Sequence, residues 1–182
     1  MKKYFLYLVI LASIGCSAPK KVSVENQNSN LETIKNPLEG TWVLKNVLMG
    51  DAMDMPCGFV NMDKVKEMNL TFTDDKGNSS DIKKLFGRSS VNNFSGGYTV
   101  LSYDEKSKTG KIQFFTLIST KMAAVNLDFM ECEKRYLSYL EKSVDFKIED
   151  GKLQLSLTIP LTGNSSSPWG ESYRNVLYFY KK

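Results

Sequence analysis

The sequence contains no histidine among its 182 residues. This absence excludes Ser-His-Asp triads, Cys-His nucleophiles and the usual zinc sites in one step. An enzyme built from this chain would therefore rely on carboxylates or lysines alone. The best such group, Asp145, Lys147, Glu149 and Lys152, falls on the polar side of a predicted hairpin, where we expect contact with solvent. We predict no catalytic residues and no enzymatic activity.

The chain also lacks a dominant charge and long apolar runs. It has 24 basic and 20 acidic residues, and a net charge of +4 that falls to about +2 if Lys2 and Lys3 are removed with a leader segment. A charge this weak and evenly spread does not favour nucleic acid as a partner. Beyond the leader, no apolar run approaches the roughly 20 residues that a membrane-spanning helix needs. The length fits one domain with a substantial core.

The N-terminus has the pattern of a bacterial lipoprotein signal. Lys2 and Lys3 precede an apolar stretch over residues 4–14, and Ser13-Ile14-Gly15 leads into Cys16. We predict a signal peptide over residues 1–15 and a lipid anchor on Cys16, although an ordinary secretory signal is an alternative. Each buried methylene of an acyl chain contributes about 0.8 kcal/mol, so two or three chains anchor durably. The membrane is therefore a predicted partner.

Residues 16–36 are predicted to form a flexible tether between lipid and domain. The segment is polar and contains too little apolar surface to order itself. Ala18-Pro19-Lys20-Lys21 is basic, whereas exported surface lipoproteins of some bacteria carry an acidic run there. We therefore expect the domain to face the periplasm.

Three cysteines are few, and two of them remain after Cys16. Cys57 and Cys132 are a candidate disulfide in an exported chain, or two separate buried thiols. Met49, Met53, Met55 and Met62 have no regular spacing, so we interpret them as gap-filling side chains rather than a Cu(I) site. We predict no metal and no cofactor.

The remaining pattern predicts a mainly β domain over residues 37–182. Residues 98–103 and 111–119 form a hairpin around the polar residues 104–110. Residues 144–149 and 152–157 form a second hairpin around Asp150-Gly151, in which Val144, Phe146 and Ile148 face Leu157, Leu155 and Leu153. Further strands are predicted over residues 41–48, 68–73 and 172–180. The fold class is α+β, mainly β, with an antiparallel sheet or partly open barrel of about seven strands and one α-helix.

The helix is predicted over residues 128–142. Its apolar face carries Phe129, Cys132, Tyr136 and Leu140 at spacings of three or four. The charged residues are assigned to the other sides, namely Glu131, Glu133, Lys134, Glu141 and Lys142.

Three stretches of the chain carry a resemblance to a known family. They are Ser90-Val91-Asn92-Asn93-Phe94-Ser95-Gly96-Gly97-Tyr98, then Ile118-Ser119-Thr120-Lys121-Met122-Ala123-Ala124, and then a helix containing Glu133 and Tyr136-Leu137. With Gly151-Lys152-Leu153-Gln154-Leu155, they resemble the META domain family of HslJ-like bacterial lipoproteins. The residues that match the motif are Asn92, Phe94, Gly96, Tyr98, Thr120 and Met122.

The resemblance implies structural roles for these residues, with glycine at a tight corner, asparagine bonded to loop backbone and the aromatic rings in the core. The family typically has cysteines where this chain has Val91 and Ala124, so Cys57 and Cys132 are expected to supply a different staple. The resemblance further implies an outer-membrane location, a role in stress tolerance and envelope integrity, and no enzymatic chemistry.

Two functions follow as hypotheses. The first is a non-catalytic envelope lipoprotein that binds another envelope component or supports envelope integrity under stress. The alternative is a lipocalin-like carrier of a small apolar ligand, because Gly40-Thr41-Trp42 is similar to the lipocalin Gly-x-Trp start. The bulky residues predicted to point inward favour a filled core and hence the first hypothesis; they are Phe146, Ile148, Leu153, Leu155 and Leu157.

Overall fold

A computed structural model describes residues 36–58, 67–77, 79, 81–122, 127–160 and 172–182. All of these residues belong to one compact unit, residues 35–182. The predicted signal peptide, Cys16 and all but the last residue of the predicted tether lie outside the described residues. That last residue, Asn36, is buried in the domain.

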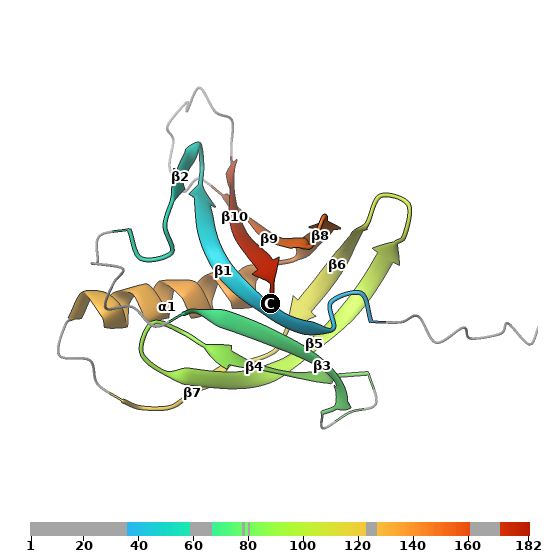
Figure 1. Ribbon diagram of the computed structural model, residues 1–182, viewed down its shortest axis with the longest axis horizontal. Coiled ribbons are helices and arrows are strands. Elements are labelled where there is room, and N and C mark those ends of the chain that lie inside the picture. Colours follow the sequence, from blue (N-terminus) through green and yellow to red (C-terminus); the bar gives the residue numbers. More distant parts are fainter. Residues whose placement is uncertain (1–35, 59–66, 78, 80, 123–126, 161–171) are drawn as a thin grey trace, which may run out of the picture. The chain divides into compact units, whose positions relative to one another are not determined.

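The domain is a closed antiparallel barrel of eight strands within the described residues (Figure 1). Neighbours follow the order β10-β9-β8-β6-β5-β4-β3-β1, and β10 pairs with β1 from Trp42↔Lys181 to Met49↔Asn175 to close the ring. The barrel strands are β1 (Gly40–Met49), β3 (Asn69–Lys76), β4 (Lys83–Arg88), β5 (Asn93–Asp104), β6 (Thr109–Phe114), β8 (Asp145–Glu149), β9 (Lys152–Pro160) and β10 (Ser172–Lys181).

Two short strands and a helix complete the described part. β2 (Ala52–Asp54) pairs with the end of β1, and β7 (Ile118–Ser119) pairs with the start of β5. α1 (Leu127–Lys142) lies against β1, β3 and β10 through Tyr136, which lines a small pocket with Leu44 and Leu177 and bonds Asn69 O. The prediction of a mainly β fold with an antiparallel sheet or barrel and one helix is confirmed. No helix in the described ranges combines the length and apolar content needed to cross a membrane.

The β8–β9 hairpin has the predicted register near its turn but not at its far end. Asp150 and Gly151 have φ values of 50° and 70°, the positive values of a type I′ turn. Phe146 pairs with Leu155 and Ile148 with Leu153, as the alternation indicated. Val144 does not face Leu157: it is 49% exposed and lies before the strand.

The reason for this error lies at the end of the helix. Ser143 donates its backbone N–H to Leu140 O and its hydroxyl to Tyr139 O, so the chain is still completing the helix terminus at Ser143. β8 therefore starts only at Asp145, which pairs with Ser156. Leu157 pairs instead with Asn175 of β10.

The interior of the barrel is filled with side chains. Trp42 is almost fully buried and donates its indole N–H to Leu38 O at 2.7 Å, as expected for a residue that plugs the core. Tyr136 of α1 packs edge-on against Phe94 of β5, and Phe72 packs edge-on against Tyr98. The largest fully buried side chains come from most of the barrel strands, from α1 and from the segment before β1: Trp42, Tyr98, Phe72, Phe179, Leu38, Leu70, Leu85, Ile112, Leu140, Leu153, Leu155 and Leu157.

Candidate functional site

Asn92 lies at the centre of a buried hydrogen-bond network beneath α1. The side-chain Oδ1 accepts from the Thr120 hydroxyl and from Met122 N, each at 2.8 Å. The side-chain Nδ2 donates to Met122 O at 3.1 Å and to Glu133 Oε1 at 2.9 Å. An asparagine side chain offers two donated and two accepted bonds, and Asn92, at 1% exposure, makes all four.

Glu133 completes this network from the helix. Its Oε2 accepts from Asn92 N at 2.8 Å and from the Ser89 hydroxyl. Ser90 adds a bond from its hydroxyl to Phe129 O at 2.8 Å. We call Ser89, Asn92, Thr120, Met122 and Glu133 the asparagine lock, because together they join the β4–β5 connection, the segment after β7 and α1.

The prediction that Glu133 lies on a polar side of the helix is wrong. Glu133 is 6% exposed, because the turn between β4 and β5 presents donors that replace water around its carboxylate. A signal for this existed in the sequence, since Glu133 stands three, four and seven residues before Tyr136, Leu137 and Leu140 on one helical face. Its negative charge is the only reason that the sequence pattern assigns Glu133 to the solvent-exposed sides of the helix.

The resemblance implied that Gly96 lies at a tight corner, but the structure places it elsewhere. It lies within β5, where a Cβ atom would come 2.7 Å from Leu117 Cδ2 and 3.1 Å from Thr116 O. Glycine fits here because the segment before β7 passes close to the strand, so that a larger residue would displace the Leu117 side chain and crowd Thr116 O. Phe94 and Tyr98 are in the core, as expected.

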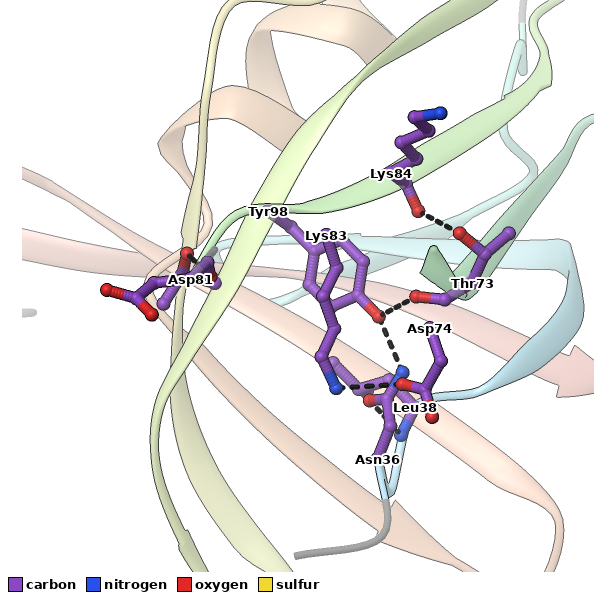
Figure 2. Close-up of polar contacts among 9 residues, drawn as sticks. Asn36, Leu38, Thr73, Asp74, Asp81, Lys83, Lys84 and Tyr98 are labelled. Carbon is purple, nitrogen blue, oxygen red and sulfur yellow. Dashed lines mark hydrogen bonds and ion pairs between the residues drawn. The ribbon is translucent and has the colours of Figure 1, made fainter. Parts of the chain in front are cut away.

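Tyr98 anchors a second polar group, at the first described residue of the domain (Figure 2). Its hydroxyl donates to Thr73 O at 2.8 Å and accepts from Asn36 Nδ2 at 2.6 Å. Asn36 Oδ1 in turn accepts from Leu38 N at 3.3 Å. Lys83 lies beside this group and bonds Asp74 at 2.7 Å, which holds the pKa of that carboxyl below its ordinary value.

Burial raises the pKa of the Tyr98 hydroxyl above the usual value for tyrosine, and the bond from Asn36 offsets part of that rise. Because the folded pKa is raised, the stabilisation is complete below about pH 10, where an unfolded tyrosine begins to ionise, and is lost as the pH rises further. Tyr136 behaves in the same direction through burial alone.

We therefore expect Tyr98→Phe to flatten the loss of stability between pH 9 and pH 11. The variant should also lose about 1–2 kcal/mol at neutral pH, since Asn36 and Thr73 lose a buried partner. Urea unfolding midpoints measured across this pH range check both effects. Tyr180→Phe, at an exposed tyrosine, is the matched control and should leave the slope unchanged. Equal slopes for wild type and Tyr98→Phe would contradict the assignment.

A disulfide joins Cys57 and Cys132. Cys57 and Cys132 have their Cα atoms 5.5 Å apart, within the usual range for such a bond. Cys57 lies in the turn after β2, and Cys132 precedes Glu133 on the buried face of α1. The bond therefore ties the helix to the turn that follows β2.

The arrangement can hold the fold together but offers little for chemistry on a substrate. The lock residues Ser89, Asn92 and Glu133 are buried, and their polar atoms are occupied by one another. Within the described ranges, no three Cys, Asp or Glu side chains come together in a group that could hold a metal ion.

The part of the interior formed by the described residues is closely packed. The pocket between α1 and strands β1 and β10, lined by residues such as Leu44, Tyr136 and Leu177, has a volume of about 10 Å³. This is near the minimum for one water molecule. Two larger hollows, of about 690 Å³ and 590 Å³, are open to solvent, and Tyr103 lines both of them.

Comparisons with known proteins agree with this structure. The model of the META domain family matches residues 33–162, a range that contains the whole asparagine lock and both disulfide cysteines. No curated protein matches the chain.

Two solved structures are similar. One is the NMR structure of a protein from Burkholderia xenovorans, at 22% identity and a TM-score of 0.51, covering 81% of this chain and 88% of that one. The other is the crystal structure of a DUF4847 family protein from Bacteroides vulgatus, at 14% identity and a TM-score of 0.40, covering 80% and 94%. At such low identity, the first likeness concerns the fold alone.

Proposed function

This chain belongs to the META domain family, and we propose that it is a non-catalytic lipoprotein of the bacterial cell envelope. In this proposal Cys16 carries the lipid anchor and residues 17–35 connect it to the barrel, which faces the periplasm from the outer membrane. The barrel binds another envelope component or supports envelope integrity under stress.

The main support for the proposal is that the motif residues have structural roles in the fold. Asn92, Thr120 and Met122 bond one another and Glu133, and Phe94 and Tyr98 fill the core. Side-chain atoms that are occupied in this way stabilise a scaffold, and the buried Asn92, Glu133, Phe94 and Tyr98 are not accessible to a substrate. A scaffold of this kind acts through its outer surface, which is where we place its partner.

The lipocalin-like alternative finds less support. A carrier barrel of eight strands holds its ligand in an interior cavity, and here Trp42, Phe72, Tyr98 and Phe179 occupy that position. Native mass spectrometry of the protein extracted gently from its own envelope tests the point. A stoichiometric apolar ligand would favour the carrier, whereas a bare domain or a bound protein favours the scaffold.

The anchor and the envelope role can be tested together in cells. A strain lacking this protein would be supplied with wild type or with Cys16→Ala, and acylation followed with an alkyne-labelled fatty acid. We expect wild type to be labelled, to fractionate with the outer membrane and to restore resistance to detergent. The Cys16→Ala variant should do none of these. Full restoration by an unlabelled variant would refute the anchored role.

A further inference from the structure

An apolar patch lies on the outer face of the barrel around the start of β5. Phe86 of β4 pairs with Ser95 of β5, and Ser95 pairs with Ile118 of β7, so all three side chains share one face. Leu85, the neighbour of Phe86, points into the core, which shows that this shared face is the outer one. Figure 1 shows β4 and β7 on this side of the barrel.

The patch is exposed, and the residue at its centre is small. Phe86 is 50% exposed and Ile118 is 70% exposed, with only the small Ser95 between them. One pair further along β5, a Cβ atom on Gly97 would lie 2.7 Å from Ile82 and 3.5 Å from Phe115, so these two half-buried side chains extend the apolar surface. We call Ile82, Phe86, Phe115 and Ile118 the β4–β7 patch.

Basic side chains border this patch. Lys84 and Arg88 alternate with Phe86 on β4, and therefore lie on either side of it on the same face. Thr120 N bonds Asn93 O, and Asn93 pairs with Arg88, which brings the exposed Lys121 to the same end of the patch.

These cations are available for a partner. Among the described residues, none of Lys84, Arg88 and Lys121 forms an ion pair within 4.0 Å. Arg88 makes one hydrogen bond, from Nε to Asn93 Oδ1 at 3.3 Å. The nearby Asp74 is taken by Lys83, and Asp81 has interactions of its own.

We propose that the β4–β7 patch docks the barrel on a bilayer surface that contains anionic lipids. Exposed Phe and Ile side chains suit the boundary between headgroups and acyl chains, and bordering lysine and arginine side chains suit anionic headgroups. The inference rests on the proposed lipid anchor, because a tether of about 20 residues reaches at most about 70 Å and keeps the barrel near the membrane. The patch then determines which face of the barrel turns towards the lipid.

Depth-sensitive fluorescence on the acylated full chain tests this orientation. Phe86→Trp and Ile118→Trp place a reporter in the patch, and Tyr180→Trp on β10 is the matched control. In the closed ring β10 lies four strands from β5 in either direction, so Tyr180, at 41% exposure, is on the opposite side. In vesicles with brominated phosphatidylglycerol, we expect quenching of both patch reporters, relative to wild type, and little at position 180.

The result must also depend on lipid charge and be specific to lipid. Quenching should weaken in phosphatidylcholine vesicles and in high salt. Equal quenching at all three positions, or quenching independent of anionic lipid, would overturn the proposal. A photoreactive side chain at position 86 that crosslinks to an envelope protein instead of to lipid would overturn it as well.

Vesicle binding by unacylated protein tests the docking surface independently of the lipid anchor. With Cys16→Ala as background, Phe86→Ser together with Ile118→Ser should lower partitioning onto phosphatidylglycerol vesicles by about tenfold or more. Tyr180→Ser should not lower it. All these variants share residues 1–35, so the difference reports the patch. If Cys16 is not acylated in cells but the patch variant still partitions less than its background, the lipid anchor is refuted and the docking surface stands. If the patch variant and its background partition equally, the docking surface is refuted.

Discussion

Asn92→Asp is expected to cost the domain about 3–5 kcal/mol of unfolding free energy, the range seen when a buried charge loses compensation. The change replaces one NH2 group by an oxygen of nearly the same size. It nevertheless turns a donor into an acceptor that faces Met122 O and Glu133 Oε1. Urea unfolding followed by circular dichroism measures the loss.

The neighbouring residue provides the control. Asn93→Asp makes the same chemical change one position along the chain, at an exposed side chain that accepts a bond from Arg88 Nε. We expect a change within about 0.5 kcal/mol there. Similar losses at positions 92 and 93 would mean that the asparagine lock does not carry the stability that its geometry implies.

A second substitution sharpens the test. Glu133→Gln in the Asn92→Asp background places an amide donor opposite the new carboxylate, so part of the lost stability should return. Glu133→Gln alone should destabilise the domain, because the new NH2 group then faces the donor groups of Asn92 or Ser89. A coupling energy of about 1 kcal/mol or more in the double-mutant cycle would identify direct contact. Strict additivity would argue against it.

Removal of the Cys57–Cys132 bond is expected to have the next largest effect, a loss of about 4 kcal/mol. The two residues are separated by 75 positions, and a crosslink over a loop of this length removes much of the entropy of the unfolded chain. Urea unfolding with and without a thiol reductant measures the difference. Cys57→Ala together with Cys132→Ala should reproduce the reduced protein.

The double variant is also the internal control, because a reductant should not shift its unfolding midpoint. Peptide mapping of the non-reduced wild-type protein should recover residues 57 and 132 in one crosslinked fragment. Recovery of both as free thiols, or a reductant effect that persists in the double variant, would contradict the assignment.

Local patterns determined much of this fold. The type I′ turn at Asp150-Gly151 follows from residues that tolerate positive φ, and the pairing of Phe146 with Leu155 follows from alternation on either side of that turn. The predicted helix 128–142 differs from α1 by one residue at its start, because its apolar spacing is regular. These features depend on residues close together in the chain, so they could be predicted from the sequence.

The tertiary structure decided where distant segments meet. Closure of the barrel pairs Trp42 with Lys181, and no local pattern specifies that contact. The burial of Glu133 depends on donors from Ser89 and Asn92, more than 40 residues earlier. Asn36 belongs to the domain because Tyr98 gives its amide a buried partner.

The physical reason is the same in each case. A sequence shows which residues are apolar, which turns are allowed and which spacing repeats. These patterns were enough to predict a mainly β domain with one helix, and they also predict a lipoprotein-like leader. A polar residue is buried only when another part of the chain replaces the water around it. That replacement is set by the packed structure, so the asparagine lock and the outward β4–β7 patch appeared only there.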